Sequence, residues 1–581
     1  MSTTRKSLEK PDFDVEHREH GQDGSAPQLY TKDEEPELHL KTWLALAAMC
    51  VLQYVSLLAL VGPPTVLVNI GASFGEDEIW RYWIPNVVTL VQAALSPMLA
   101  SISDVFQARK AVMVVLTTIS FVGAAIAPNS GSIFRLIGAS LMIGFGLAAA
   151  PLSYAVPSEI VPRRWRPLCQ ALINVAAGLG AITGPLVIGA LTQQDPIDGW
   201  RRFYWVQMAL WGFSVVGILF GYLPPKRTSD ASTLMNKLGR IDWVGSALLT
   251  AAIALFVAGF NLVSVFAWSS AKVLGPLVSG VAAFIIFGLY EAFGTKTGIL
   301  PHELFRGGGR HGWAFAIFCF LFFIEGVTFF ALVTFYPVMT NALFTQDPLG
   351  GAVRLLPLFA ASSAFTAIYG WASSHFKDIK YCMFVGFALY TGGIVGLATV
   401  QPGQPGVAIG SLTLCGIGLA GPLVLILTGT QLSVQHHLIA TATALVVASR
   451  TLAASMFVAA YSTALNQRLG TYIPTYIANA VVPAGLPPQS IGAFIGAFAS
   501  GAREAVAQVP GVTPAIIAAA GAAYQQAFAD GVRVVFIIAA PFGAVGCVLC
   551  LLLPSFSDKM DYLVEAPLED LHKRANHGGK V

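Results

Sequence analysis

The sequence predicts an all-α, polytopic membrane protein with about fourteen transmembrane helices. Of its 581 residues, 55% are hydrophobic and 11% are charged, whereas about 25% of the residues in an average soluble domain are charged. The apolar residues form continuous blocks of about twenty, the length at which a helix crosses about 30 Å of hydrocarbon. A β-barrel is excluded, because its strands would show short segments of alternating hydrophobicity.

Each apolar block is expected to form one membrane-spanning helix. In chain order, the expected spans are 42–62, 83–103, 111–127, 133–155, 169–191, 203–223, 242–260, 273–292, 313–338, 352–374, 381–400, 406–428, 438–464 and 532–554. Basic residues gather in alternate links, such as Arg109 and Lys110 after the second span and Arg163, Arg164 and Arg166 after the fourth. By the positive-inside rule these links are cytoplasmic, and with an even number of spans both termini are expected there too.

The segments outside the spans narrow the functional class. Residues 1–41 lack the apolar core of a signal peptide, so we expect a disordered cytoplasmic tail there, and residues 555–581 are interpreted in the same way. The seven cysteines show no metal-ligand spacing, and the chain contains no glycine-rich phosphate loop. No soluble segment is large enough for a catalytic core. We therefore expect neither an enzyme nor a cofactor or metal site, but a gradient-driven transporter of a small molecule.

The longest expected segment between spans, residues 465–531, is assigned to the extracellular side. Within it, Ile491, Phe494, Ile495 and Phe498 recur at helical spacing, which predicts an amphipathic helix lying on the surface. A packing lid over the outer face of the bundle is favoured over a partner-binding site.

The expected fifth span contains GLGAITGPLVIG at residues 178–189, an unusual composition for a helix. Gly180 and Gly184 form a GxxxG pair, which lets another helix approach closely, and Pro185 bends the axis. At 100° per residue, Gly178, Pro185 and Gly189 fall in a narrow stripe on a different side of the helix. These residues predict a bent helix that a neighbouring helix approaches closely.

Two polar turns, SISDVFQARK at residues 101–110 and SEIVPRRWRP at residues 158–167, accompany this stretch. Together the three motifs resemble those of the major facilitator superfamily, whose hallmark is an acidic residue at the end of the second span followed by a basic turn. The resemblance implies that the acid and the basic residues latch two six-helix halves on the cytoplasmic side in the outward-open state. It also implies an antiporter motif in the fifth span, in which Gly180, Gly184 and Pro185 form a bent sliding surface. The residues that carry these gating roles are Asp104, Arg109, Lys110, Glu159, Arg166, Gly180, Gly184, Pro185 and Gly189.

The turn after the second span departs from the family pattern. Gln107 and Ala108 stand where the family usually has a glycine and a first arginine. We therefore expect a latch that is weaker than usual or differently connected.

The span count, with LGRIDWVG before the seventh span, resembles the fourteen-span drug:proton antiporters. AGLPPQSIGAFIGAF, AQVPGVTPAI, GVRVVF and ASRTLAASMFVAAYSTAL resemble the fungal branch that contains trichothecene efflux pumps and siderophore-iron transporters. The resemblance implies six-helix bundles at residues 42–224 and 311–554, the second with the extracellular insertion at 465–531. Two linker helices are expected within residues 225–310.

Two charges lie near the centres of expected spans, where ionisable side chains are costly and a functional role is the default hypothesis. Glu325 is the candidate for proton binding, because burial penalises its charged form. Arg450 is expected to hold the opposing charge or to pair with an anionic group of the substrate. A purely structural ion pair is the alternative interpretation of both residues.

Other charges typical of proton antiporters are missing from the first half. Ser140 occupies the position where many of them carry an arginine in the fourth span, and the first span contains no acid. Candidate residues of the substrate cavity are the polar side chains Gln53, Asn86, Gln92, Asn174 and Gln207. With the phenylalanines of the ninth span, they suit a bulky amphiphilic solute better than a sugar or an ion.

These observations lead to one expected function and two alternatives. We expect a monomeric, proton-coupled secondary transporter in the plasma membrane that exports a hydrophobic toxin, drug or secondary metabolite by alternating access. Its partners are a small-molecule substrate, protons and the lipid bilayer, with no nucleic acid. The first alternative is uptake of a siderophore-iron complex by proton symport, and the second is a receptor that binds a solute without moving it.

Overall fold

The computed structural model describes residues 33–224, 238–263, 265–295, 298–300, 304–305, 313–344, 348–499, 506, 508–568 and 571. In this part of the chain, fourteen helices are long and apolar enough to cross a membrane, and each overlaps one expected span. The all-α class and the span count are therefore confirmed. Most of the expected N-terminal tail, residues 225–237 of the linker and residues 572–581 of the C-terminal tail lie outside the described residues.

The first half of the structure forms a bundle of six spans around a core rich in aromatic side chains. Trp200, Tyr204 and Trp211 are fully buried in that core. The fourth span consists of two consecutive helices, and short helices connect the spans. The elements are α1 (Leu40–Val61), η1 (Pro63–Val66), α2 (Leu67–Ala72), η2 (Gly75–Tyr82), α3 (Trp83–Phe106), α4 (Arg109–Ile126), η3 (Ala127–Asn129), α5 (Ile133–Ala148), α6 (Ala150–Ile160), η4 (Arg163–Trp165), α7 (Arg166–Gln194) and α8 (Gly199–Gly221).

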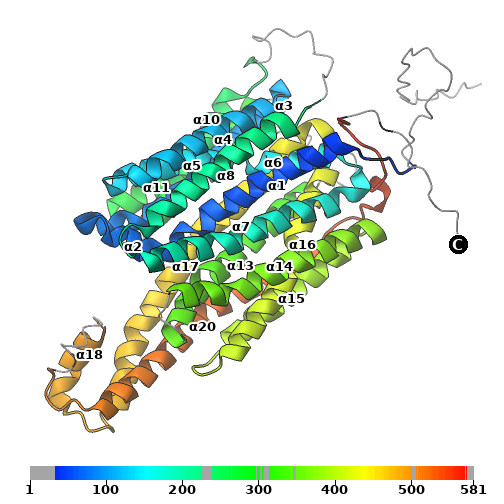
Figure 1. Cartoon of the computed structure of the whole chain (residues 1–581). Coiled ribbons are helices and arrows are strands. Elements are labelled where there is room, and N and C mark those ends of the chain that lie inside the picture. The colour runs from blue at the N-terminus through cyan, green and yellow to red at the C-terminus, as the bar shows by residue number, and fades with distance from the viewer. Residues whose placement is uncertain are drawn as a thin grey trace, which may run out of the picture.

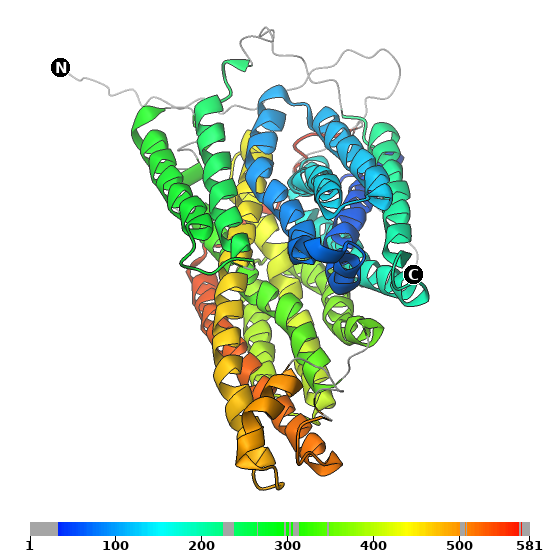
Figure 2. The ribbon, with the colours of Figure 1, turned by 90° about the vertical axis from the view of Figure 1, so that its left-hand side faces the viewer.

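Two further spans, α10 (Trp243–Leu262) and α11 (Ala271–Leu289), pack against each other at the side of the bundle (Figure 2). Their approach is close, because a Cβ atom on Gly280 would lie 2.7 Å from the backbone nitrogen of Phe256. From this pair, α10 contacts α3 of the first half and α17 of the second. A short π-helix, η5 (Tyr290–Gly294), follows α11.

The second half supplies the remaining six spans. Its largest buried side chains include Phe315, Phe318, Tyr336 and Phe387. The elements are α13 (Ala314–Leu343), α14 (Pro348–Phe376), α15 (Lys380–Ala398), α16 (Pro405–Ser433), η7 (His436–Leu438), α17 (Ile439–Val481), η8 (Pro488–Ser490), α18 (Ile491–Ala499), α20 (Pro514–Leu552) and η9 (Ser557–Lys559).

The last two spans extend far beyond the expected limits. Helix α17 has 43 residues and α20 has 39, so at 1.5 Å per residue they are about 65 and about 58 Å long, twice the hydrocarbon thickness. Figure 1 shows their protruding ends with α18 beside them. Helix α18 does not stand apart as a surface helix, since its Phe494 is buried with Ile477 of α17 and Ile516 of α20 in a small separate core. Residues 465–531 thus form mainly a helical hairpin.

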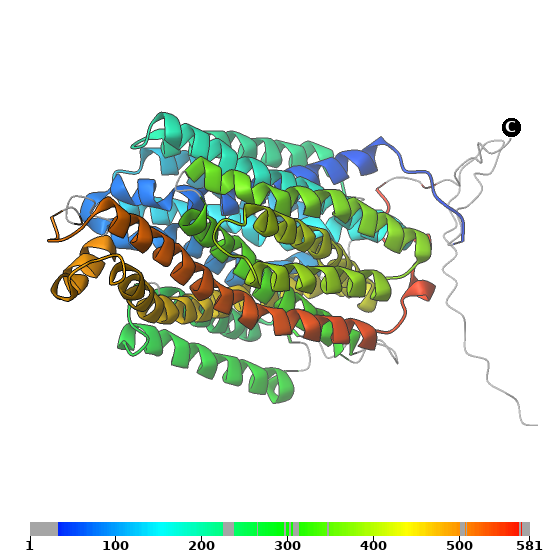
Figure 3. The same ribbon diagram turned by 90° about the horizontal axis from the view of Figure 1, so that it is seen from below.

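The two halves meet along pairs of long helices, α7 with α14 and α3 with α17. Seen from below, the helices of both halves run roughly parallel to one long axis (Figure 3). At one end of that axis α3 and α6 finish, α7 and α17 begin, and the chain leaves α20 toward its C-terminus. We call this end the gate face.

Candidate functional site

A buried ion cluster at the gate face joins three of the residues that the motifs single out. The Arg109 guanidinium donates to Glu159 through Nε, at 2.8 Å from Oε2, and through a second, short bond to Oε1. Its Nη2 also lies 2.9 Å from Oδ1 of Asp104, and all three side chains are at most 8% exposed. Because α3, α4 and α6 each supply one residue, the arginine links three helices of the first half.

The cluster reaches the second half through the free oxygen of Asp104. Its Oδ2 accepts hydrogen bonds from the backbone nitrogen of Thr441 at 2.9 Å and from the Thr441 hydroxyl at 2.7 Å. Thr441 lies in the first turn of α17, where backbone N–H groups have no partner within the helix and favour a negative charge. The α17 N-terminus is therefore capped by an acid from the other half.

The basic turn between Asp104 and Arg109 shows how this sequence accommodates its departure from the family pattern. Gln107 has a φ of +53°, in the left-handed region that favours glycine. Lys110 does not join the ion cluster, because its ammonium donates to the carbonyl oxygen of Leu219 on α8 at 2.7 Å. Of the two basic residues in the motif, Arg109 alone contacts the acids.

Arg166 takes part in a second set of contacts between the halves. Its Nη1 donates to the carbonyl oxygen of Gln431 on α16 at 3.2 Å. One turn further along α7, the Gln170 amide donates to the Gln431 side chain at 3.0 Å and to the Tyr154 carbonyl at 2.8 Å. These side chains are fully buried, so the halves are held together by desolvated hydrogen bonds.

A contact that the motifs did not predict comes from the segment after α20. The Glu565 carboxylate lies 2.9 Å from Arg163 Nε, 2.9 Å from Arg166 Nη2 and 2.7 Å from His436 Nδ1. Burial alone would raise the pKa of Glu565, but the His436 hydrogen bond and the charges of Arg166, His436 and Arg163 outweigh it and lower this pKa to about 2. No pattern in the sequence pairs this acid with arginines 400 residues away.

The glycines of α7 pack against two different neighbouring helices, α1 and α14. A Cβ on Gly180 would lie 2.1 Å from the Tyr54 carbonyl oxygen, and one on Gly184 would lie 2.9 Å from that of Leu58, both on α1. The GxxxG pair therefore packs against α1 within the first half, and its expected role as a sliding surface stays a prediction. The side facing the other half contains Gly178, whose Cβ would lie 2.0 Å from the Ser363 hydroxyl of α14, and Gly189, which faces Leu349.

The mid-membrane charges lie together in the second half. Arg450 of α17 donates from Nη2 to Glu325 Oε1 of α13 at 3.0 Å. Its Nε lies 2.7 Å from Oε2, as an ion-pair contact without hydrogen-bond geometry. The carboxylate is fully buried, whereas 23% of the arginine side chain is exposed. The pair is thus open on the arginine side only.

The surroundings of this pair are aromatic and closely packed. The Arg450 guanidinium lies 4.6 Å from the ring centre of Phe329 and 5.1 Å from that of Phe322, which stabilises the cation. A Cβ on Gly326 would lie 2.6 Å from the Arg450 carbonyl oxygen. Gly326, which the sequence analysis missed, lets α13 and α17 approach closely enough for the two charges to meet.

The expected cavity residues divide among different environments. Asn174 of α7 accepts a hydrogen bond from the Tyr154 hydroxyl of α6 at 3.3 Å. Gln53 is instead used to join α1 to α6, because its amide donates to Ser153 Oγ at 2.7 Å and to the Ala150 carbonyl at 3.2 Å. Asn86 and Gln92 are half-buried on α3.

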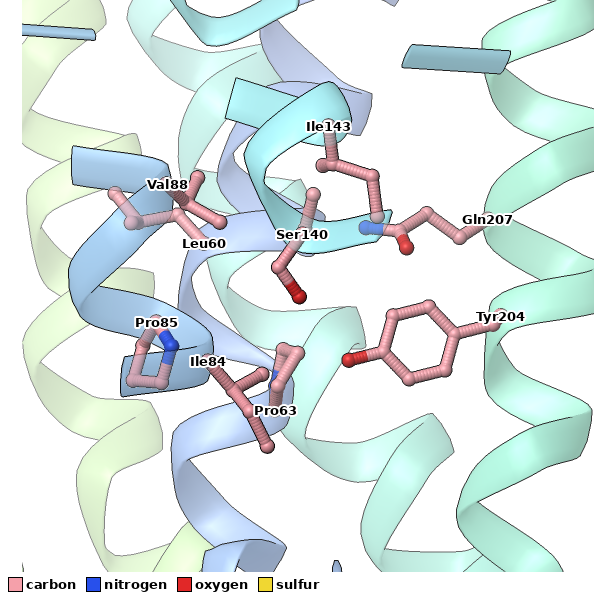
Figure 4. A pocket seen from close by; sticks show the side chains of 10 residues that line it. Leu60, Pro63, Ile84, Pro85, Val88, Ser140, Ile143, Tyr204 and Gln207 are labelled. Carbon is pink, nitrogen blue, oxygen red and sulfur yellow. The ribbon is translucent and has the colours of Figure 1, made fainter. Parts of the chain in front are cut away.

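Gln207 lines a small cavity inside the first half, apart from the Glu325–Arg450 pair. All the residues around it come from α1, η1, α3, α5 and α8, and Figure 4 shows Gln207, Tyr204 and Ser140 around the gap. Its volume of about 10 Å³ leaves room for about one water molecule. Neither polar atom of the fully buried Gln207 amide makes a hydrogen bond within the described part of the chain. A water molecule in this cavity would satisfy both atoms.

The comparison with protein families places this geometry in a known context. The family model of the fungal trichothecene efflux pump (TRI12) matches residues 39–578. The chain belongs to this family. It is therefore a multi-pass membrane protein of the major facilitator superfamily, in its fungal efflux branch, whose members are named as transporters and not as enzymes.

Relatives of this efflux-family chain agree with that assignment. The MFS-type transporter ucsD of an Acremonium species is 26% identical over 61% of this chain and 59% of its own length. The acurin A biosynthesis cluster MFS-type transporter of Aspergillus aculeatus is 24% identical over 64% and 65%. The chain thus spans less than two thirds of each of these relatives. The major facilitator superfamily proton:xylose symporter XylE shares the fold, with a TM-score of 0.50 and 13% identity over 86% of this chain and 94% of that one.

Proposed function

We propose that this efflux-family transporter is a proton-coupled exporter of a hydrophobic toxin, drug or secondary metabolite that works by alternating access. Proton coupling is carried by one observation, the fully buried Glu325 carboxylate paired with a partly exposed Arg450. A buried carboxylate is costly when ionised and unpaired, so a proton on Glu325 and the Arg450 charge are alternative ways to neutralise the site.

In this proposal Arg450 communicates between the proton and the substrate. When Glu325 is ionised, its carboxylate holds the guanidinium. When Glu325 binds a proton, the attraction falls and the guanidinium becomes available to polar groups of a solute in the cavity. The phenylalanine rings beside Arg450 supply apolar surface for an amphiphilic substrate. The name of the acurin A cluster transporter supports a secondary metabolite as the solute class.

Alternating access requires a closed barrier on one side of the cavity. The barrier on the gate face consists of the Asp104 bonds to Thr441 and the Arg166 and Gln170 bonds to Gln431. We further propose that the gate face is cytoplasmic, that both termini lie there, and that the chain acts as a monomer in the plasma membrane. The basic links next to this face support the orientation.

Export is tested by drug retention in a host that lacks its own efflux pumps. Cells with the chain, with the Glu325→Gln variant or with an empty vector are loaded with a panel of hydrophobic toxins, dyes and fungal metabolites. We expect cells with the unmodified chain to retain less of at least one compound than both other strains. Equal retention of every compound in all strains, together with chain-dependent growth on ferric siderophores, would instead establish uptake.

A further inference from the structure

Residues 553–568, which follow the last span, lie across the gate face and contact both halves. We call this segment the strap. The chain leaves α20 at Leu553, which is buried, and runs back over the ends of other spans in Figure 1. It contains only the short helix η9, so it is held in place by its contacts with other elements.

The first part of the strap is anchored in the second half. Phe556 and Met560 are buried in the same core cluster as Phe318 of α13, and the rings of Phe318 and Phe556 are 5.8 Å apart. Between them, the Lys559 ammonium donates to the carbonyl oxygen of Leu432 on α16 at 3.1 Å. Burial of these two large apolar side chains stabilises the anchor.

The second part of the strap is anchored in the first half. Three backbone hydrogen bonds pair it with the turn after α6: Ala566 to Glu159 at 2.8 Å, Arg163 to Leu563 at 3.1 Å and Arg164 to Asp561 at 2.8 Å. Leu568 is buried in the core cluster of the first half. The Arg164 guanidinium lies over the Tyr562 ring. Its Nη1 donates a hydrogen bond to the Tyr562 hydroxyl at 2.7 Å.

Glu565 connects the two halves electrostatically. Its Oε1 lies 2.9 Å from both Arg163 and Arg166 of the first half, and its Oε2 lies 2.7 Å from His436 of the second half. Without this carboxylate, the three basic groups would face one another at the gate face. The nearby Asp561 lies farther from the same arginine, with its Oδ2 at 3.7 Å from Arg163 Nη1.

We propose that the strap is a gate element of the transport cycle, with Glu565 as the positioning residue that holds the two halves together at the gate face. Three backbone hydrogen bonds hold residues 561–568 on the α6–α7 turn, so for the gate to open Glu565 must separate from His436 of the second half. The strap thus adds a barrier to opening that is independent of the Asp104–Thr441 contact. This inference rests on the proposed alternating access, but not on the substrate or on protons.

The test measures gate opening directly, by the distance between spin labels on Leu223 after α8 and Phe376 at the end of α14, in a chain without native cysteines. Both positions are exposed. In Glu565→Gln, we expect the population at the longer distance to rise about tenfold, as fits the loss of hydrogen bonds to charged groups. Asp558→Asn is the matched control, because it removes the same charge from an exposed position of the strap; it should leave the distances unchanged. Equal distributions in both variants and the unmodified chain would overturn the proposal.

A second experiment does not depend on the folding of the Glu565→Gln variant. Cysteines replace Glu565 and His436 and are joined by a short thiol reagent that reduction cleaves. We expect transport to stop in the cross-linked protein and to return on reduction. Full transport while cross-linked would overturn the proposal. Since label distances are read without substrate or a pH gradient, a failure of proton coupling would leave this test intact.

Discussion

The Asp104–Arg109–Glu159 cluster at the gate face and the Glu325–Arg450 pair in the centre differ in which helices they connect. At the gate face, Asp104, Arg109 and Glu159 share charges among three helices of the first half, and Asp104 reaches across to Thr441 of the second. In the centre, Glu325 of α13 pairs with Arg450 of α17, so this pair connects two helices of the second half. The gate cluster is almost fully buried, whereas the central arginine is partly exposed.

Under the proposed function, this difference gives the two clusters separate tasks. Breaking the gate contacts separates the halves, so these charges control conformation. Neutralising Glu325 breaks no contact between the halves, so the central pair is able to exchange a proton or meet a solute while the gate stays closed.

The largest effect is expected for Arg109→Ala. The substitution leaves the Asp104 and Glu159 carboxylates buried without their shared cation, and breaking a buried ion pair costs about 3–5 kcal/mol. We expect a clear fall of the thermal unfolding temperature in lipid nanodiscs. Lys110→Ala, which removes a neighbouring cation outside the cluster, is the control and should cost less than about 1 kcal/mol. Equal effects of both changes would contradict the shared-cation role of Arg109.

A smaller effect is expected for Thr441→Ala, because the backbone N–H bond to Asp104 remains. The lost hydroxyl donated to a carboxylate, and such a bond is worth about 1.5–3 kcal/mol. The gate should open more often, as read by the spin-label distances between residues 223 and 376, without a change in proton dependence. Thr441→Ser keeps the donor and should behave like the unmodified chain; an open gate in that variant would point to packing instead of the hydrogen bond.

The smallest effect concerns pH at the strap. The pKa of Glu565 is about 2 in the folded chain and near 4.5 without its partners, so its stabilising contribution is complete above about pH 5 and lost as the pH falls through about 2. In a Glu325→Gln background we therefore expect no gate opening between about pH 8 and pH 5. Opening within this range would assign pH control to another gate residue.

The positions of the membrane-spanning helices were largely predictable, because each is marked by a continuous block of apolar residues. A span needs only about twenty apolar residues, and each expected block became a helix. The exceptions are α17 and α20, which continue past the apolar blocks because their extensions pack on each other and on α18 instead of on lipid. That contact joins segments about 40 residues apart, so no local pattern of hydrophobicity reveals it.

The candidate site was predictable only where the partners are close in sequence or marked by a motif. Helical geometry separated the two glycine-bearing sides of α7, but it could not say that Gly180 faces α1 while Gly178 faces α14. The polar motifs marked Asp104 and Arg109, yet Thr441 is 337 residues from Asp104 and is one of many threonines. Glu565 lies in a segment that the sequence analysis treated as a disordered tail, because its anchors, Phe556 and Met560, are too few to form an apolar block.

The proposed role of Glu325 as the carrier of the coupled proton is tested by transport in sealed vesicles with the purified chain. A compound from the retention panel is supplied, and its movement is followed with and without an imposed pH gradient. For the unmodified chain and for Glu37→Gln, an exposed control near the N-terminus, we predict that the gradient accelerates transport. In Glu325→Gln, whose amide still accepts a bond from Arg450, transport should continue at the rate without a gradient and show no acceleration. Gradient-driven transport at the unmodified rate in Glu325→Gln would contradict the claim.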